Sequence, residues 1–196
     1  MKIKICGLFR EQDIEAVNEA MPDYIGFVFA KSHRQVSVET AQKLKNKLNK
    51  NILSVGIFVN EDINKIAEIC NKNIIDLVQL HGDEDDNYIK ELRKLCNNKI
   101  IKAVKVKSGE DILRWRNTLA DYILFDGGAG SGIKFDWELL KSVIRPYFIA
   151  GGINQTNIDE AIKLKPYCID ISSGVETNKL KDKEKILKIV RRVKYE

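Results

Sequence analysis

The stretch ILSVGIFVNEDINKIAEIC, residues 52–70, contains the pattern that decides the fold. Its first part, Ile52–Val59, is apolar on both alternating faces, as a strand must be when its sheet is covered on both sides. After a polar corner at Asn60, apolar side chains recur at the spacing of one helix face, at Ile63, Ile66, Ala67 and Cys70. The stretch therefore predicts one buried strand followed by one amphipathic helix.

The same unit recurs along the chain, with no linker or low-complexity segment between repeats. The apolar runs are Ile3–Cys6, Tyr24–Phe29, Ile52–Val59, Ile75–Leu80, Ile100–Val106, Tyr122–Asp126, Phe148–Gly151 and Cys168–Ser172. Strict alternation of strands and helices implies a parallel sheet, and eight strands close such a sheet into a barrel. The alternative is an open doubly wound sheet, which a GxGxxG turn after the first strand would favour; none follows that strand.

We therefore predict an α/β protein, a (β/α)8 TIM barrel forming one domain over residues 1–196. Because such barrels typically have about 250 residues, its loops must be short. Two of the expected helices, Asp111–Leu119 and Trp137–Ile144, are short, and Asp136 stands where the second needs an N-cap.

The composition excludes several classes of protein. A hydrophobic share of 44% and a charged share of 31% are typical of globular proteins and exclude disorder.

No apolar stretch approaches the roughly 18 residues of a membrane span, and the N-terminus lacks the features of a signal peptide, so we expect a cytoplasmic protein without a membrane partner. The 33 basic and 28 acidic residues give a net charge of +5, but the lysines are scattered, so we expect no nucleic-acid partner. No strongly apolar exposed stripe is evident, which favours a monomer and leaves a homodimer open.

The four cysteines, Cys6, Cys70, Cys96 and Cys168, include no CxxC pair, and the chain has only two histidines. This spacing predicts neither a metal site nor a disulfide framework.

Glycine clusters follow three neighbouring strands, where the loops of a barrel carry its chemistry. They are GGAGSG with Gly130, Ser131 and Gly132, then AGGIN with Gly151 and Gly152, then SSGVE with Ser173 and Gly174. Glycine allows backbone N–H groups to surround an anion. We interpret the clusters as a phosphate-binding site; the alternative is that they only form tight turns.

Two rim residues are candidates for proton transfer. Asp126 ends an apolar strand, where partial burial would raise its pKa and make it a proton donor, although it could instead cap the glycine loop. Cys6 ends the first strand and could act as a thiolate base or be a small buried hydrophobe. Strands one and six lie three places apart around an eight-stranded ring, so a substrate could sit between these side chains.

Three further polar residues belong to this end of the barrel. Arg34 follows the second strand, and its planar guanidinium group can bind a carboxylate through two hydrogen bonds. The alternative is that Arg34 is a solvated cation on a loop. His81 ends the fourth strand, where it either bonds the substrate or supports its loop; we favour support. Asp170 lies inside the eighth strand, which indicates a structural role.

Together these residues resemble the phosphoribosylanthranilate isomerase family of tryptophan biosynthesis. The resemblance covers the whole chain in order, through KICG (4–7), GFVF (26–29), S-x-R-x-V (32–36), VGIFVN (55–60), VQLHG (78–82), FDW (135–137), AGGI (150–153) and SSGVE (172–176). Phe9 departs from the threonine common in the family, and His33 from a common proline.

The resemblance implies a compact single-domain barrel that performs an Amadori rearrangement of a phosphorylated aminoaldose without metal or organic cofactor. It assigns the general base to Cys6, the general acid to Asp126, the contact with the anthranilate carboxylate to Arg34, and the phosphate to the glycine loops. A cysteine base must be a thiolate, so we expect the basic mouth of the barrel and backbone dipoles to lower the pKa of Cys6 below its free value.

Three other functions stay open at this point. The aminoaldose isomerase of histidine biosynthesis shares the chemistry but has an aspartate where this chain has Cys6. A Schiff-base lyase would use Lys102 or Lys105, which should face opposite sides of their strand. A phosphate-binding module without activity should have lost the acid or the base.

Overall fold

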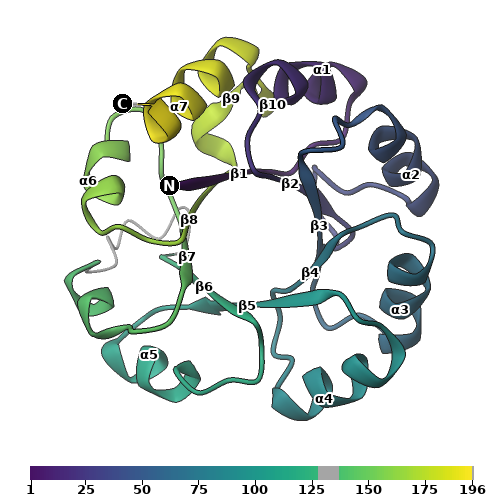
Figure 1. Cartoon of the computed structure of the whole chain (residues 1–196), viewed down its shortest axis with the longest axis vertical. Coiled ribbons are helices and arrows are strands. Elements are labelled where there is room, and N and C mark those ends of the chain that lie inside the picture. The colour runs from purple at the N-terminus through teal and green to yellow at the C-terminus, as the bar shows by residue number, and fades with distance from the viewer. Residues whose placement is uncertain (128–136, 196) are drawn as a thin grey trace.

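The computed structural model describes residues 1–127 and 137–195. Eight parallel strands close into a barrel in sequence order, with helices around the outside (Figure 1). The predicted TIM barrel is therefore confirmed. The strands are β1 (Lys2–Cys6), β2 (Tyr24–Val28), β3 (Leu53–Phe58), β4 (Leu77–Leu80), β5 (Lys99–Lys105), β6 (Tyr122–Asp126), β7 (Tyr147–Ala150) and β8 (Cys168–Ile171).

The helices fill the intervals between the strands. They are α1 (Glu11–Ala20), α2 (Val38–Lys47), α3 (Ile63–Asn71), α4 (Asp86–Leu95), α5 (Gly109–Trp115), α6 (Ile158–Lys163) and α7 (Lys183–Tyr195). Side-chain caps start several of them: the Ser37 hydroxyl accepts from the N–H of Thr40, and Asp62 accepts from two N–H groups of the first turn of α3. Caps and apolar stripes together explain why these short segments are helical.

The interval between β6 and β7 differs from the expectation. In place of a helix over Trp137–Ile144, a 3-10 helix, η1, covers Trp137–Ser142. Asp136, the expected N-cap, lies outside the described residues. The preceding short helix is α5, which ends four residues before the predicted Leu119.

The alternation of each strand produces two separate apolar regions. Side chains such as Ile3, Ile5 and Ile100 pack between the strands and the helices. Side chains of opposite orientation fill the barrel itself: Tyr24, Val55, Ile57, Leu77, Ile101, Ala103, Leu124, Phe148, Ala150 and Cys168. At the amino-terminal end, four aromatic rings close the barrel by mutual contact, those of Tyr24, Tyr122, Phe148 and Tyr167.

The first and last strands meet to complete the ring. β1 pairs with β8 in the register Lys4 to Asp170, and α7 packs beside α1 on the outside (Figure 1). Between β8 and α7 lies an addition absent from the prediction. It consists of a short 3-10 helix, η2 (Ser173–Val175), and a two-stranded antiparallel ribbon of β9 (Glu176–Thr177) and β10 (Leu180–Lys181). This segment brings Glu176 and Lys181 to the carboxyl-terminal rim.

In the ranges 1–127 and 137–195, no helix has both the length and the apolar character that crossing a membrane requires.

Candidate functional site

The thiol of Cys6 lies at the rim, half-buried at the end of β1. Its sulfur rests against Gly26 of β2, where a Cβ atom would approach Sγ to 2.7 Å, far inside van der Waals contact. The carbonyl of Cys6 accepts a hydrogen bond of 3.0 Å from the Ser172 hydroxyl. Gly26 therefore leaves room for the sulfur, and Ser172 holds the backbone of Cys6 in place.

The ionisation of Cys6 differs from the expectation. Burial raises the pKa of the thiol above its ordinary value, and Asp170 adds to the rise, whereas the ammonium groups of Lys4 and Lys181 lower it. Because burial outweighs the two cations, the pKa of Cys6 is raised, and the predicted depression of this pKa is wrong. The cations nevertheless stand where they reduce the cost of forming a thiolate.

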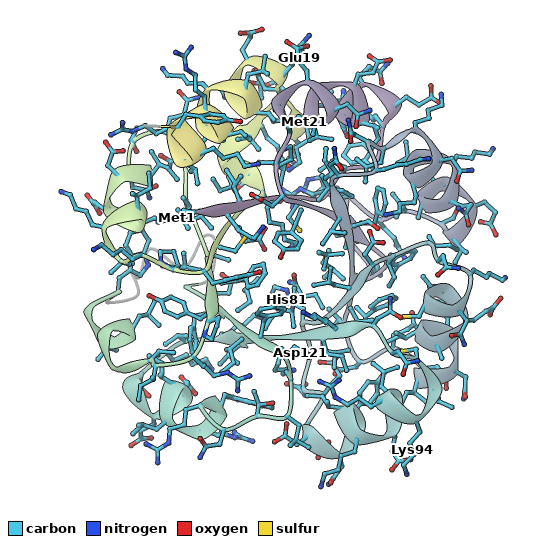
Figure 2. The ribbon with its side chains drawn as sticks, viewed as in Figure 1. Met1, Glu19, Met21, His81, Lys94 and Asp121 are labelled. Carbon is cyan, nitrogen blue, oxygen red and sulfur yellow. The ribbon has the colours of Figure 1, made fainter. Side chains whose placement is uncertain are left out.

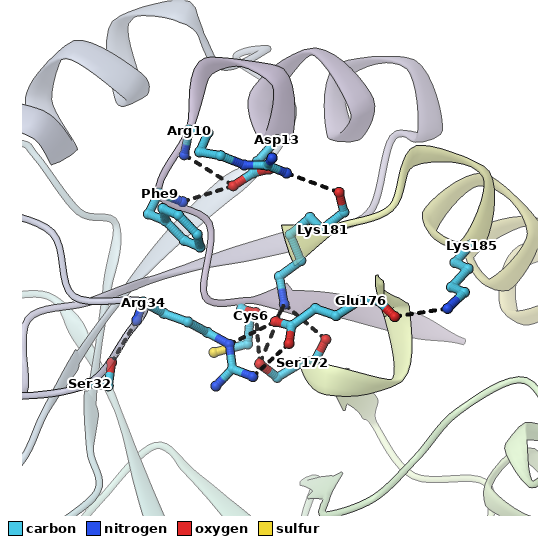
Figure 3. Close-up of polar contacts among 10 residues, drawn as sticks. All are labelled: Cys6, Phe9, Arg10, Asp13, Ser32, Arg34, Ser172, Glu176, Lys181 and Lys185. Atoms are coloured by element: carbon cyan, nitrogen blue, oxygen red, sulfur yellow. Dashed lines mark hydrogen bonds and ion pairs between the residues drawn. The ribbon is translucent and has the colours of Figure 1, made fainter. Parts of the chain in front are cut away.

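Arg34 lies beside Cys6, but a protein carboxylate holds one side of its guanidinium (Figure 3). Its Nε and Nη2 donate to the two carboxylate oxygens of Glu176 at 2.7 and 2.8 Å, and this pairing raises the pKa of Arg34. The side chain crosses Gly7 so closely that a Cβ there would lie 2.3 Å from Cδ of Arg34. Gly7, with φ of +83°, therefore allows the guanidinium to lie at the mouth.

Glu176 joins Arg34 to a buried lysine. Lys181 Nζ donates to Glu176 Oε1 at 2.7 Å and to the carbonyl of Ser172 at 2.9 Å (Figure 3). Burial by itself would raise the pKa of Glu176, but the bonds from Arg34 and Lys181 prevail and lower it to about 2. Two cations thus share one carboxylate directly beside Cys6, which leaves the group with a net positive charge.

Asp126 and His81 form a second polar pair on the opposite part of the rim. His81 Nε2 lies 3.3 Å from Oδ2 of Asp126, and both side chains are mostly buried. The other oxygen of Asp126, Oδ1, faces the loop after β7, because a Cβ on Gly151 would come within 2.9 Å of it. His81 therefore contacts the candidate acid. Whether it also bonds the substrate or supports its own loop stays a prediction.

A chain of polar side chains continues from His81 into the barrel. His81 lies inside the ring of strands (Figure 2), and its Nδ1 is 2.9 Å from Nε2 of Gln79. Gln79 Oε1 accepts from Lys4 Nζ at 2.8 Å. Lys4 also donates to Oδ2 of Asp170 at 2.8 Å, and Asp170 thereby raises the pKa of Lys4 against the effect of burial. The layer below the rim is therefore a hydrogen-bonded polar layer.

The glycine loops after β7 and β8 approach each other closely. A Cβ on Gly174 would lie 1.9 Å from the carbonyl oxygen of Ile153, so only glycine fits where the two loops cross. Gly151 and Gly152 have φ of +100° and +65°, in the left-handed region that favours glycine. Within the described ranges, the N–H groups of Gly152, Ser173 and Gly174 donate to no protein acceptor. This arrangement suits an anion.

The third predicted glycine cluster cannot be placed in the same way. Gly130, Ser131 and Gly132 lie outside the described residues.

Sequence reasoning missed four residues of this region: Lys4, Gln79, Glu176 and Lys181. A signal existed for the first two. Lys4 stands two residues before Cys6, and Gln79 two before His81, so strand alternation places each pair on one face. A polar residue inside an otherwise apolar strand, in phase with a candidate site residue, is the pattern that indicates them.

The two lysines considered for a Schiff base face opposite ways, as alternation predicts. Lys102 points outward and is buried, with Nζ donating to Glu84 at 2.9 Å and to the carbonyl of Gly82 at 2.7 Å. Lys105 is exposed and is the register partner of Asp126. Lys102 is therefore committed to an ion pair outside the mouth.

In the part of the chain that the structure describes, no three His, Cys, Asp or Glu residues are grouped so that they could hold a metal ion.

Comparison with known proteins gives consistent similarities. The family model described as N-(5′-phosphoribosyl)anthranilate (PRA) isomerase matches residues 3–192. The N-(5′-phosphoribosyl)anthranilate isomerase of Endomicrobium trichonymphae is 50% identical, and the match covers 97% of this chain and 96% of that protein.

Solved structures agree with the sequence relatives. A phosphoribosyl anthranilate isomerase in complex with reduced 1-(o-carboxyphenylamino)-1-deoxyribulose 5-phosphate matches with a TM-score of 0.87 and 32% identity, over 99% of this chain and 98% of that one. A structure of monomers generated from the dimeric isomerase of Thermotoga maritima matches with a TM-score of 0.88 and 32% identity, with the same coverage.

Proposed function

Because the chain belongs to the N-(5′-phosphoribosyl)anthranilate isomerase family, we propose that it converts N-(5′-phosphoribosyl)anthranilate into 1-(2-carboxyphenylamino)-1-deoxyribulose 5-phosphate in tryptophan biosynthesis. The observation that carries the proposal is the arrangement of one rim. This rim combines a thiol, a carboxyl group and a guanidinium with glycine loops whose N–H groups donate to no acceptor in the described residues. These are the groups that this substrate requires. The related structure that holds a reduced form of the product supports the same substrate class.

The reaction is an Amadori rearrangement in which Asp126 acts as the acid and Cys6 as the base. Asp126 protonates the ring oxygen of the ribose, the C1′–O bond breaks, and the nitrogen lone pair forms an iminium ion. This cation acidifies the C2′–H, and the Cys6 thiolate removes that proton. The resulting enolamine tautomerises to the ketone, so no atom is gained or lost. Each acid or base step of this kind contributes about 10²–10⁴-fold.

The ionisation of Cys6 fits this order of events. Burial keeps the pKa of the thiol high, while Lys4 and Lys181 oppose that effect. A positive iminium ion beside the sulfur adds a third cation at the moment when the base is needed. The thiolate is therefore favoured after ring opening rather than before it.

The substrate's two anionic ends define its orientation. We assign the phosphate to the loops after β7 and β8, where Gly152, Ser173 and Gly174 present their N–H groups. The ring oxygen, two bonds from C5′, then lies beside β6 and Asp126. Glu176 accepts hydrogen bonds from Nε and Nη2 of Arg34. We therefore assign the contact with the anthranilate carboxylate to the remaining guanidinium nitrogen, Nη1.

The test is steady-state kinetics on freshly prepared phosphoribosylanthranilate. Cys6→Ala and Asp126→Asn should each lower kcat by about 10³-fold or more, with circular dichroism unchanged. Cys70→Ala is the matched thiol control, because Cys70 is buried on α3, and it should retain activity. Near-normal turnover of either rim variant would reject the assignment.

We propose that the protein is a monomer, as its sequence favours, although its relative from Thermotoga maritima is described as dimeric. Light scattering during gel filtration should give a mass near 22.4 kDa; twice that mass would indicate a homodimer.

A further inference from the structure

One interaction in the polar chain fixes the direction of all the others. Lys4 Nζ carries only donors, so the atom of Gln79 that it contacts at 2.8 Å must be the acceptor Oε1. The Gln79 amide nitrogen, a donor, is therefore the atom turned toward His81 Nδ1, 2.9 Å away. Nδ1 must accept this bond, and an accepting ring nitrogen carries no proton.

The consequence reaches the candidate acid. A neutral imidazole whose Nδ1 is unprotonated carries its proton on Nε2. Nε2 lies 3.3 Å from Oδ2 of Asp126, so the proton on Nε2 lies beside that carboxylate oxygen. The other oxygen of Asp126, Oδ1, faces Gly151 and the loop assigned to phosphate.

We propose that Gln79 is a positioning residue: oriented by Lys4, it holds His81 in the Nε2–H tautomer, whose proton faces Oδ2 of Asp126, the proposed acid. This inference rests on the proposed role of Asp126 as the acid. It also gives the buried Lys4 a role in the acid half of the reaction, in addition to its effect on Cys6.

Other charged groups lie near His81 and Asp126. Asp170 binds Lys4 from β8, Lys105 is the register partner of Asp126 on β5, and Cys6 lies within the electrostatic reach of Lys4 on β1. Of these groups, Lys4 is the one that contacts Gln79, so the orientation of the amide depends on Lys4 in particular.

The first measurement is the tautomer itself, read from ¹⁵N–¹H correlations of the imidazole rings. The chain has only two histidines, and His33→Gln assigns the remaining signals to His81. The unmodified protein should show the Nε2–H form. Gln79→Glu offers His81 only an acceptor, so Nδ1 should gain a proton in that variant. An Nδ1–H form in the unmodified protein would overturn the proposal.

The second measurement is kinetic. Gln79→Met should lower kcat by about three- to tenfold, the effect of one hydrogen bond, while KM changes less than twofold. His81→Gln retains an N–H near the position of Nε2 and should keep more activity than His81→Asn, whose amide reaches only the position of Nδ1. Equal activity of these two variants would also overturn the proposal.

The outcomes separate the positioning role from the proposed function. If Asp126→Asn is fully active, the acid assignment fails regardless of the tautomer. If Asp126→Asn is inactive while Gln79→Glu leaves both the tautomer and kcat unchanged, the acid assignment stands and the role of Gln79 is rejected. Should Gln79→Met fail to fold, Gln79→Glu and the two His81 variants still decide the question.

Discussion

Lys4 and Lys102 are both buried lysines with a carboxylate partner, yet they lie on opposite faces of the sheet. Each is at most 1% exposed, and each pairs with its carboxylate at 2.8 or 2.9 Å. Lys4 points into the barrel, where it contacts Asp170 and Gln79 below the rim. Lys102 points toward the helices, where its ammonium also lies over the ring of Trp115.

The two buried lysine–carboxylate ion pairs connect to different parts of the molecule, because they lie on opposite faces of the sheet. The partner of Lys102, Glu84, accepts from the backbone N–H groups of Asn60 and Gly82, so this ion pair anchors the loops that follow β3 and β4. The partner groups of Lys4 instead lead to His81 and, through charge, to Cys6. The outward-facing lysine thus anchors two loops, whereas the inward-facing one belongs to the polar chain that leads to the proposed catalytic residues.

The largest expected effect comes from exchanging each lysine for methionine. Both variants leave a buried carboxylate unpaired, so each should lose about 3–5 kcal/mol of unfolding free energy in urea titrations. Only Lys4→Met should also lower kcat/KM by about 100-fold or more, whereas Lys102→Met should stay within about tenfold of the unmodified protein. Equal losses of activity would mean that the two faces do not differ in this respect.

A double variant tests whether charge balance or chemistry explains the loss. Lys4→Met combined with Asp170→Leu removes both charges and should recover most of the lost stability. Its activity should stay low, because neither the orientation of Gln79 nor the cation beside Cys6 is restored. Recovery of activity together with stability would reduce Lys4 to a purely structural residue.

A smaller effect is expected on the reactivity of the thiol. Cys6 is the one half-buried cysteine of the four, so its alkylation by iodoacetamide can be followed against pH. Because burial raises its pKa, the rate should reach its midpoint at a higher pH than for free cysteine. Lys4→Met should move the midpoint higher still, while Lys102→Met should leave it in place. A downward movement in Lys4→Met would contradict the proposed electrostatics.

The smallest effect concerns Glu176, which pairs with a third buried lysine, Lys181. Its pKa is lowered from 4.5 to about 2, so its contribution to stability is complete above pH 4.5 and is lost as the pH falls toward 2. The contribution is on the order of 1–3 kcal/mol. Urea unfolding at several pH values should show a steeper decline below pH 4.5 for the unmodified protein than for Glu176→Gln; parallel curves would contradict this linkage.

The barrel could be predicted because its signal is repeated. Runs such as Ile52–Val59 are apolar on both faces, and the stripes between them have helical spacing, so each unit supports the same architecture. The prediction was wrong where the signal is short: η1 replaces the expected helix, and the β9–β10 ribbon spans only two residues in each strand. Such elements depend on tertiary contacts more than on local pattern.

The site was predictable where residues stand at the ends of strands. Topology alone brings Cys6 and Asp126 to one rim, and their catalytic roles stay predictions. The pairing of Arg34 with Glu176 was not predictable, because it joins residues 142 positions apart through a ribbon with no sequence signal. The raised pKa of Cys6 was also missed, because desolvation depends on packing that spacing does not reveal.

The ion pair between Lys4 and Asp170 spans the seam where β1 meets β8, residues 166 positions apart. During synthesis, Lys4 leaves the ribosome well before Asp170. Until β8 docks, the ammonium has no carboxylate to compensate its burial, so the inner layer cannot form around it. The catalytic interior is thereby assembled only once β8 has been made, and a chain truncated before β8 should neither close nor protect Cys6 from solvent.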